Sequence, residues 1–243
     1  MTNRITQLTK EELAEIQRLD TPTISNVLEP LEIRPWTEGF CGPEIRCMFP
    51  DFGTMVGYAV TLEMGARDKS DGVPRDQYWQ AVLEVPEPRI IVVHDRDYPY
   101  PIGSFWGEVQ ANIGLGLGAV GCVTDGGVRD LLETQALGFH FFAKDVLVSH
   151  AYGHVEKVGG TVEIGGNPRH HGLKITNGDL IVGDRHGVIQ VPHDVARRLP
   201  ELAQRTADRE SIIIETAQRD NVTVKALKEA SARMQAFGRG DIH

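Results

Sequence analysis

An arginine and two carboxylates follow a glycine-rich stretch in the middle of the chain. Arg129 and Asp130 come directly after the segment GCVTDGGV of residues 121–128, and Glu133 follows about one helical turn later. The planar guanidinium of Arg129 suits a carboxylate, and the hard oxygens of Asp130 suit Mg²⁺ or Mn²⁺. These residue types predict a site for a small anionic acid beside a divalent cation.

The same residues also permit a purely structural interpretation. Asp130 and Glu133 have the spacing of a capping box, in which two side chains satisfy free N–H groups at the start of a helix. Arg129 could equally form a surface ion pair. The residues alone leave both interpretations open.

Glu108 is a further candidate, because it follows Trp106-Gly107 at the expected start of another helix. A glutamate at a helix start is commonly a surface residue favoured by the helix dipole. Together with Arg129 and Asp130, it instead supports a shared site. His150 and His154 have a zinc spacing only on a helix, and the surrounding strand and loop pattern does not favour zinc.

The elements around these residues alternate between strand and helix. The pattern predicts strands at Met55–Met64, Arg89–His94, Val120–Thr124 and Phe139–Ala143, a turn at Asp125–Gly127, and helices at 77–83, 106–117 and 131–137. Such alternation indicates an α/β layer. It places Arg129 and Asp130 at a strand-to-helix junction, where backbone N–H groups favour anions.

The two ends of the chain differ from this middle part. Capping signals at Thr9–Glu12 and Thr21-Pro22 predict two N-terminal helices, and residues 32–54 are expected to be mostly loop. Short apolar runs between turn signals over residues 145–191 predict a β-rich section. We expect a core over residues 1–192, followed by a C-terminal helical arm over residues 193–243 that serves oligomerisation.

Composition and charge narrow the class of partner. The chain has 243 residues, a formal net charge of −9 and three cysteines. A net negative charge and the lack of a basic stripe argue against nucleic acid, and no apolar run approaches the ~20 residues of a membrane span. The N-terminus lacks the apolar core of a secretory signal, so a cytoplasmic location is expected. An acidic protein that binds an anionic substrate needs a local arginine or metal.

Three segments resemble the RraA-like family, over residues 19–192. They are DTPTISNVL at residues 20–28, the pattern G-x-V-x-D-G-x-x-R-D at residues 121–130, and LIVGDRHGVIQVP at residues 180–192. The family includes 4-hydroxy-4-methyl-2-oxoglutarate / 4-carboxy-4-hydroxy-2-oxoadipate aldolases and regulators of ribonuclease activity. The resemblance implies a three-layer β/β/α sandwich like the swivelling phosphohistidine domain, with helical N- and C-terminal arms. It also implies a homotrimer or homohexamer.

The aldolase type implies a class II, metal-dependent pyruvate aldolase that cleaves a 4-hydroxy-2-oxo acid, and oxaloacetate decarboxylation at the same site. By this resemblance Asp130 would bind Mg²⁺ or Mn²⁺ directly, and Glu108 and Glu133 would hold metal-bound waters. Arg129 would bind the 2-oxo acid, helped by backbone groups at Gly107, Val109 and Gln110. Family members usually carry Asp where Glu108 stands here.

Two other functions stay open. Regulator-type members often lack the aspartate after the arginine, so Asp130 favours a catalytic member over a non-catalytic protein that binds a ribonuclease. A related lyase that acts on another hydroxy acid is the second alternative. The stretch Asp95–Phe105 could shape its pocket, with Tyr98, Tyr100 and Trp106 either lining that pocket or packing in the core.

Overall fold

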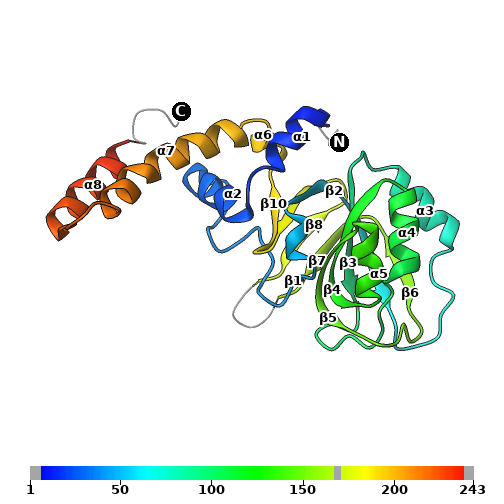
Figure 1. The fold of residues 1–243 in the computed structure, drawn as a ribbon. Coiled ribbons are helices and arrows are strands. Elements are labelled where there is room, and N and C mark those ends of the chain that lie inside the picture. Colours follow the sequence, from blue (N-terminus) through cyan, green and yellow to red (C-terminus); the bar gives the residue numbers. More distant parts are fainter. Residues whose placement is uncertain (1–6, 167–170, 238–243) are drawn as a thin grey trace.

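A mixed β-sheet forms the centre of the protein, as described by the computed structural model for residues 7–166 and 171–237 (Figure 1). Its strand order is β1-β5-β4-β3-β2-β9-β10, and β6 pairs with the end of β2. The parallel strands are β2 (Met55–Gly65), β3 (Arg89–Asp95), β4 (Ala119–Val128) and β5 (His140–Val146). The antiparallel strands are β1 (Arg46–Cys47), β6 (His154–Val158), β9 (Leu180–Asp184) and β10 (Gly187–Val191).

Helices connect the parallel strands and cover one face of the sheet. They are α3 (Arg75–Leu83), α4 (Glu108–Gly116) and α5 (Leu131–Leu137). On the opposite face lies the two-stranded sheet of β7 (Thr161–Ile164) and β8 (Leu173–Thr176). Side chains that alternate along β3 divide between the two faces, with Ile91 and Val93 in the core cluster under the helices and Ile90 and Val92 in the cluster under the hairpin. The expected β/β/α sandwich is therefore confirmed.

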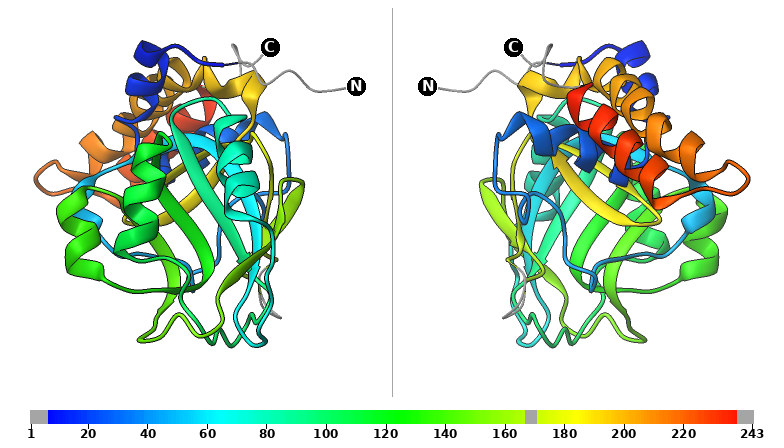
Figure 2. Two further views of the ribbon diagram at one scale, coloured as in Figure 1. Left: turned by 90° about the vertical axis from the view of Figure 1, so that its right-hand side faces the viewer. Right: turned by 90° about the vertical axis from the view of Figure 1, so that its left-hand side faces the viewer.

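The remaining helices gather at one end of the sandwich (Figure 2). They are α1 (Lys10–Ile16), α2 (Thr21–Leu28), α6 (His193–Ala196), α7 (Leu199–Ala217) and α8 (Val224–Ala236). The predicted capping box is present, with Thr9 and Glu12 each accepting the other's backbone N–H. Leu199 and Ala203 of α7 are buried in the core, whereas the distal part of α7 and α8 project from the body (Figure 1). Docking of this arm on a neighbouring subunit stays a prediction.

Most of the loop expected over residues 32–54 is present. Within it the structure adds β1 and a short 3-10 helix at Pro50–Phe52, and another 3-10 helix at Glu29–Leu31 precedes it. The β-rich section expected over residues 145–191 contains β6, β7, β8, β9 and β10, and β5 extends into it as far as Val146. Among the described helices, none is long and apolar enough to cross a membrane.

Candidate functional site

The end of β4 has a different backbone from the one that its glycines predicted. Asp125–Gly127 is not a turn but the continuation of β4, whose register against β5 shifts between Thr124 and Gly127. The glycines are needed for space rather than for a turn. A Cβ at Gly126 would lie 2.5 Å from Asp95 Oδ2, and one at Gly127 would lie 2.4 Å from Leu147 Cδ1. The bulged strand carries the chain forward to Arg129.

A buried carboxylate holds this strand end to its neighbours. Asp125 is fully buried, and it accepts the N–H of Asp95 at 2.7 Å and that of Gly165 at 3.1 Å. His94 Nδ1 lies 2.8 Å from the same carboxylate, and this hydrogen bond raises the pKa of His94. Burial raises the pKa of Asp95 to about 6. These contacts fix the end of the sheet from which the candidate site extends.

Asp130 stabilises the start of α4 rather than the start of its own helix. Its backbone is left-handed, with φ 51° and ψ 49°, and its side chain makes no capping hydrogen bond to α5. Instead Asp130 Oδ2 accepts the N–H of Glu108 at 3.1 Å and the Nε–H of Arg129 at 3.3 Å. Of the two interpretations left open for Asp130, the capping box with Glu133 is therefore wrong, because the left-handed backbone does not lead the side chain into the α5 turn.

Gly107 allows this approach because it has no side chain. A Cβ on Gly107 would lie 2.4 Å from Asp130 Oδ2 and 3.0 Å from Arg129 Cγ. Its backbone is extended, with φ −161°, so space and not backbone freedom requires glycine here. The position of Asp130 thus depends on the residue before α4.

The predicted substrate-binding residues lie around one cavity of about 250 Å³. Its lining includes Gly107, Val109, Gln110, Arg129 and Asp130. The first N–H groups of an α-helix lack intrahelical partners and favour anions. In the described part of the chain, the backbone N–H groups of Val109 and Gln110 donate to no backbone carbonyl outside α4. The cavity therefore combines a guanidinium, a carboxylate and two available N–H groups.

The other two predicted carboxylates lie at the edge of this arrangement. Glu108 and Glu133 are exposed, and their side chains do not belong to the lining of the cavity. Glu108 contacts Asp130 through its backbone N–H. Any role of these two carboxylates at the site would require intervening water.

Several lining residues were not identified from the sequence. They are Arg75 at the start of α3, Ser104, Phe105, His150 and Gly153. These residues come from segments far apart in the chain, and only the proximity of Asp95–Phe105 to the site gave a signal. Within that stretch Ser104 and Phe105 line the cavity.

The aromatic residues singled out beside the site have other places. Trp106 is fully buried and stacks on Phe139 at 5.8 Å between ring centroids, so it packs in the core. Tyr98 donates a hydrogen bond to the carbonyl of Gly166, and Tyr100 is 80% exposed. These residues were expected either to line the pocket or to pack in the core, and Trp106 packs in the core.

The donor set for a metal is small. Among residues 7–166 and 171–237, no group of three or more His, Cys, Asp or Glu side chains is placed to hold a metal ion. His150 lies outside the helices and His154 begins β6, and each directs Nδ1 to a backbone carbonyl at 2.8 Å. The Asp130 side chain accepts its hydrogen bonds from Glu108 and Arg129 at Oδ2, which leaves Oδ1 available with respect to the residues that the structure describes. A cation here would have one carboxylate ligand and would depend on water and substrate for the rest.

Comparison with known proteins agrees with the fold and the sequence segments. The model of the family described as "RraA-like: Aldolase/RraA" matches residues 21–190. Protein DlpA of Legionella pneumophila is 26% identical over 207 residues, which cover 85% of this chain, and the match spans 30% of the length of that protein.

Two solved structures share the fold. An uncharacterized protein from Pseudomonas syringae pv. tomato is 24% identical, with a TM-score of 0.70 and coverage of 95% of this chain and 97% of its own. RraAS2 of Streptomyces coelicolor, described as an unusual member of the RNase ES inhibitor RraA protein family, is 21% identical, with a TM-score of 0.65 and coverage of 84% and 97%. Since the family model matches well over half of the sequence, this chain belongs to the RraA-like family.

Proposed function

We propose that this protein is a class II pyruvate aldolase that requires Mg²⁺ or Mn²⁺. Its substrate would be a 4-hydroxy-2-oxo acid such as 4-hydroxy-4-methyl-2-oxoglutarate, and it would also decarboxylate oxaloacetate. The observation that supports this proposal is the shared cavity of Arg129, Asp130 and the first turn of α4. An RraA-like chain without such a set would have no evident means of stabilising an enolate.

The cavity can bind the acid end of the substrate. The Arg129 guanidinium can hold a carboxylate through two parallel hydrogen bonds, and the N–H groups of Val109 and Gln110 offer further donors. Arg75 adds a second positive charge to the lining. This local charge compensates for the net charge of −9 of the chain.

The chemistry requires stabilisation of negative charge at the 2-oxo oxygen. In aldol cleavage the C3–C4 bond breaks, the C4 hydroxyl loses its proton, and the bonding electrons form a pyruvate enolate that is then protonated at C3. In this proposal the Arg129 guanidinium would stabilise the enolate oxygen. Mg²⁺ or Mn²⁺ held by Asp130 would supply Lewis-acid stabilisation at the same oxygen.

The donor set fits such a cation. Mg²⁺ keeps several waters and is commonly held by only one or two carboxylates, which matches the single available oxygen Asp130 Oδ1. Glu108 and Glu133 would act only by holding water near Asp130, consistent with their exposure.

Release of pyruvate tests the proposal. Purified protein would be assayed with oxaloacetate and with 4-hydroxy-4-methyl-2-oxoglutarate, in Mg²⁺, in Mn²⁺ and in EDTA. We expect metal-dependent turnover that falls by at least about 100-fold in Asp130→Asn, because the variant loses the anionic ligand. The amide oxygen of asparagine can still accept the N–H of Glu108, so the thermal midpoint should change little. Asp51→Asn, at an exposed position on a 3-10 helix, is the matched control.

The family also includes ribonuclease inhibitors, so an assay without pyruvate release would favour that second function. If the protein releases no pyruvate in either metal from either substrate, the aldolase proposal is wrong. Inhibition of a ribonuclease that persists in Asp130→Asn and Arg129→Gln would then identify a regulator.

A further inference from the structure

A second cavity adjoins the one that contains Arg129 and Asp130. It has a volume of about 310 Å³, within the range of small-molecule sites. Five residues line both cavities: Arg75, Phe105, Val109, Gln110 and Gly153. The second cavity is therefore placed to receive whatever extends from a substrate whose acid end lies at Arg129.

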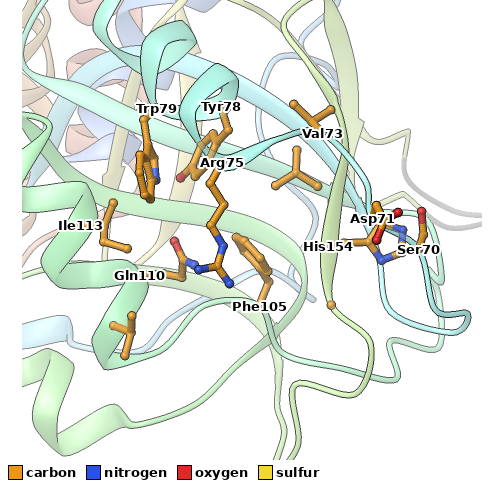
Figure 3. A pocket seen from close by; sticks show the side chains of 13 residues that line it. Ser70, Asp71, Val73, Arg75, Tyr78, Trp79, Phe105, Gln110, Ile113 and His154 are labelled. Atoms are coloured by element: carbon orange, nitrogen blue, oxygen red, sulfur yellow. The ribbon is translucent and has the colours of Figure 1, made fainter.

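The wall of the second cavity is largely aromatic and aliphatic on one side. Three partly buried side chains face it: Trp79 from α3, Phe105 from the loop before α4, and Ile113 from α4. Figure 3 shows these three side chains together with Arg75. The polar side chains of Ser70, Asp71 and His154 lie at the right of the same view. Flat apolar walls of this kind suit a ring, because an aromatic ring can stack on Trp79.

Two buried polar atoms in this lining lack partners. Tyr78 is only 2% exposed, and its hydroxyl has no hydrogen-bond partner among the described residues; the same holds for the buried Oε1 of Gln110. Figure 3 shows both side chains directed toward the space beside Trp79. Because buried polar atoms are nearly always hydrogen-bonded, a ligand with a polar group is the simplest partner. The Tyr78 hydroxyl can donate and the Gln110 oxygen can accept, and one ligand hydroxyl can serve both.

We propose that the second cavity binds a hydroxylated aromatic ring carried on C4 of the substrate acid. The ring would stack on Trp79, and its hydroxyl would meet Tyr78 and Gln110. This inference rests on the proposed aldolase function and specifies its substrate class as 4-hydroxy-4-aryl-2-oxobutanoates. A sugar-like chain fits less well, because Phe105 and Ile113 have no polar side-chain atoms to pair with its hydroxyls.

The reaction needs no further reactant. The C3–C4 bond breaks, the C4 hydroxyl gives up its proton and becomes the carbonyl of a hydroxybenzaldehyde, and the electron pair passes to C3. Protonation of the resulting enolate at C3 gives pyruvate. The number of protons and electrons is unchanged overall.

Binding is tested separately from turnover. The probe is 4-(4-hydroxyphenyl)-2-oxobutanoate, which lacks the C4 hydroxyl and cannot undergo cleavage; its Kd is measured by calorimetry on the full-length protein with Mg²⁺. Ile113→Trp fills the cavity, and Leu115→Trp, at an exposed position on the same helix, is the matched control. We expect at least about tenfold weaker binding in Ile113→Trp and in Trp79→Ala, and an unchanged Kd in Leu115→Trp.

Turnover is compared as a ratio. The ratio of kcat/KM for 4-hydroxy-4-(4-hydroxyphenyl)-2-oxobutanoate to that for oxaloacetate should fall about tenfold or more in Trp79→Ala and stay constant in Trp36→Ala, which removes an exposed tryptophan elsewhere. If Ile113→Trp does not fold, as judged by its thermal midpoint, Trp79→Ala decides.

The two proposals fail in different ways. If oxaloacetate is decarboxylated but the aryl probe does not bind, or binds equally well to Ile113→Trp and Trp79→Ala, the ring-binding cavity is refuted and the aldolase stands. If no acid is turned over but the probe binds and Ile113→Trp abolishes binding, the aldolase is refuted and the ring-binding cavity stands.

Discussion

Replacing Gly107 by alanine should displace Asp130 without removing any functional group. The added Cβ would lie 2.4 Å from Asp130 Oδ2, whereas an ordinary contact begins at 3.4 Å. Either Asp130 or the start of α4 must therefore move by about 1 Å. A displacement of that size at a catalytic group lowers rates by roughly 100-fold. We expect kcat/KM for metal-dependent pyruvate release to fall by about that factor.

Gly116 supplies the matched control on the same helix. A Cβ at Gly116 would have no heavy atom within 4 Å, so alanine should fit without displacement and should stabilise α4 by up to about 1 kcal/mol. Gly107→Ala should instead lower stability by about 1–3 kcal/mol through overpacking. Pyruvate release coupled to NADH oxidation and thermal unfolding of both variants measure the two effects.

One result would refute this reasoning. If Gly107→Ala keeps the activity of the unchanged protein while its crystal structure shows Asp130 displaced, then the position of Asp130 does not matter for turnover. A fall in activity that Gly116→Ala shares would assign the effect to α4 in general.

Three further substitutions follow from the contacts described. Arg129→Lys keeps the charge but loses the paired donors, so KM for oxaloacetate should rise about tenfold, as steady-state kinetics would show. Burial raises the pKa of Asp95 from 3.8 to about 6, so ionisation of this carboxyl destabilises the native state as pH rises through 6. The free energy of unfolding of Asp95→Asn should therefore exceed that of the unchanged protein by up to about 3 kcal/mol at pH 7.5 and by little below pH 4. Urea unfolding at the two pH values measures this difference. Burial raises the pKa of Asp184, but hydrogen bonds from Thr21 and His186 lower it by more, so the pKa in the folded protein lies below the ordinary value. Asp184 therefore stabilises the fold above its unfolded pKa, and this stabilisation is lost as pH falls through the folded pKa. In the same urea unfolding experiment, Asp184→Ala should lower the free energy of unfolding by about 1–3 kcal/mol at pH 7 and by less at pH 3.

Local signals predicted the elements that carry the site. The strand before Arg129 and the helix after Asp130 are encoded by short-range patterns, an apolar run followed by helical spacing that ends at Gly138, and both elements are present. The capping box at Thr9 is equally local, and it is confirmed. Such features depend on residues within a few positions of one another, which a sequence displays directly.

Features that depend on distant residues were beyond the sequence. The pair Gly126-Gly127 has the composition of a turn, yet glycine is required there by Asp95 and Leu147, which approach from other elements. The spacing of Asp130 and Glu133 suggested a cap on α5, but the side chain of Asp130 instead accepts the N–H of Glu108, 22 residues earlier in the chain. The cavity wall at Trp79 came from a segment whose spacing indicated only a helix.

The structural and functional interpretations of Asp130 need not compete. Oδ2 caps α4, so it is held in place by the N–H of Glu108, and Oδ1 remains available for a cation. In the proposed function the same helix start would offer its N–H groups to the substrate acid, which would bring two negative groups to one end of α4. Two carboxylates so close repel each other unless positive charge lies between them. Arg129 already contacts Asp130 and supplies part of that charge. A divalent cation at Oδ1 would supply the rest, so the proposed metal would assist substrate binding as well as catalysis.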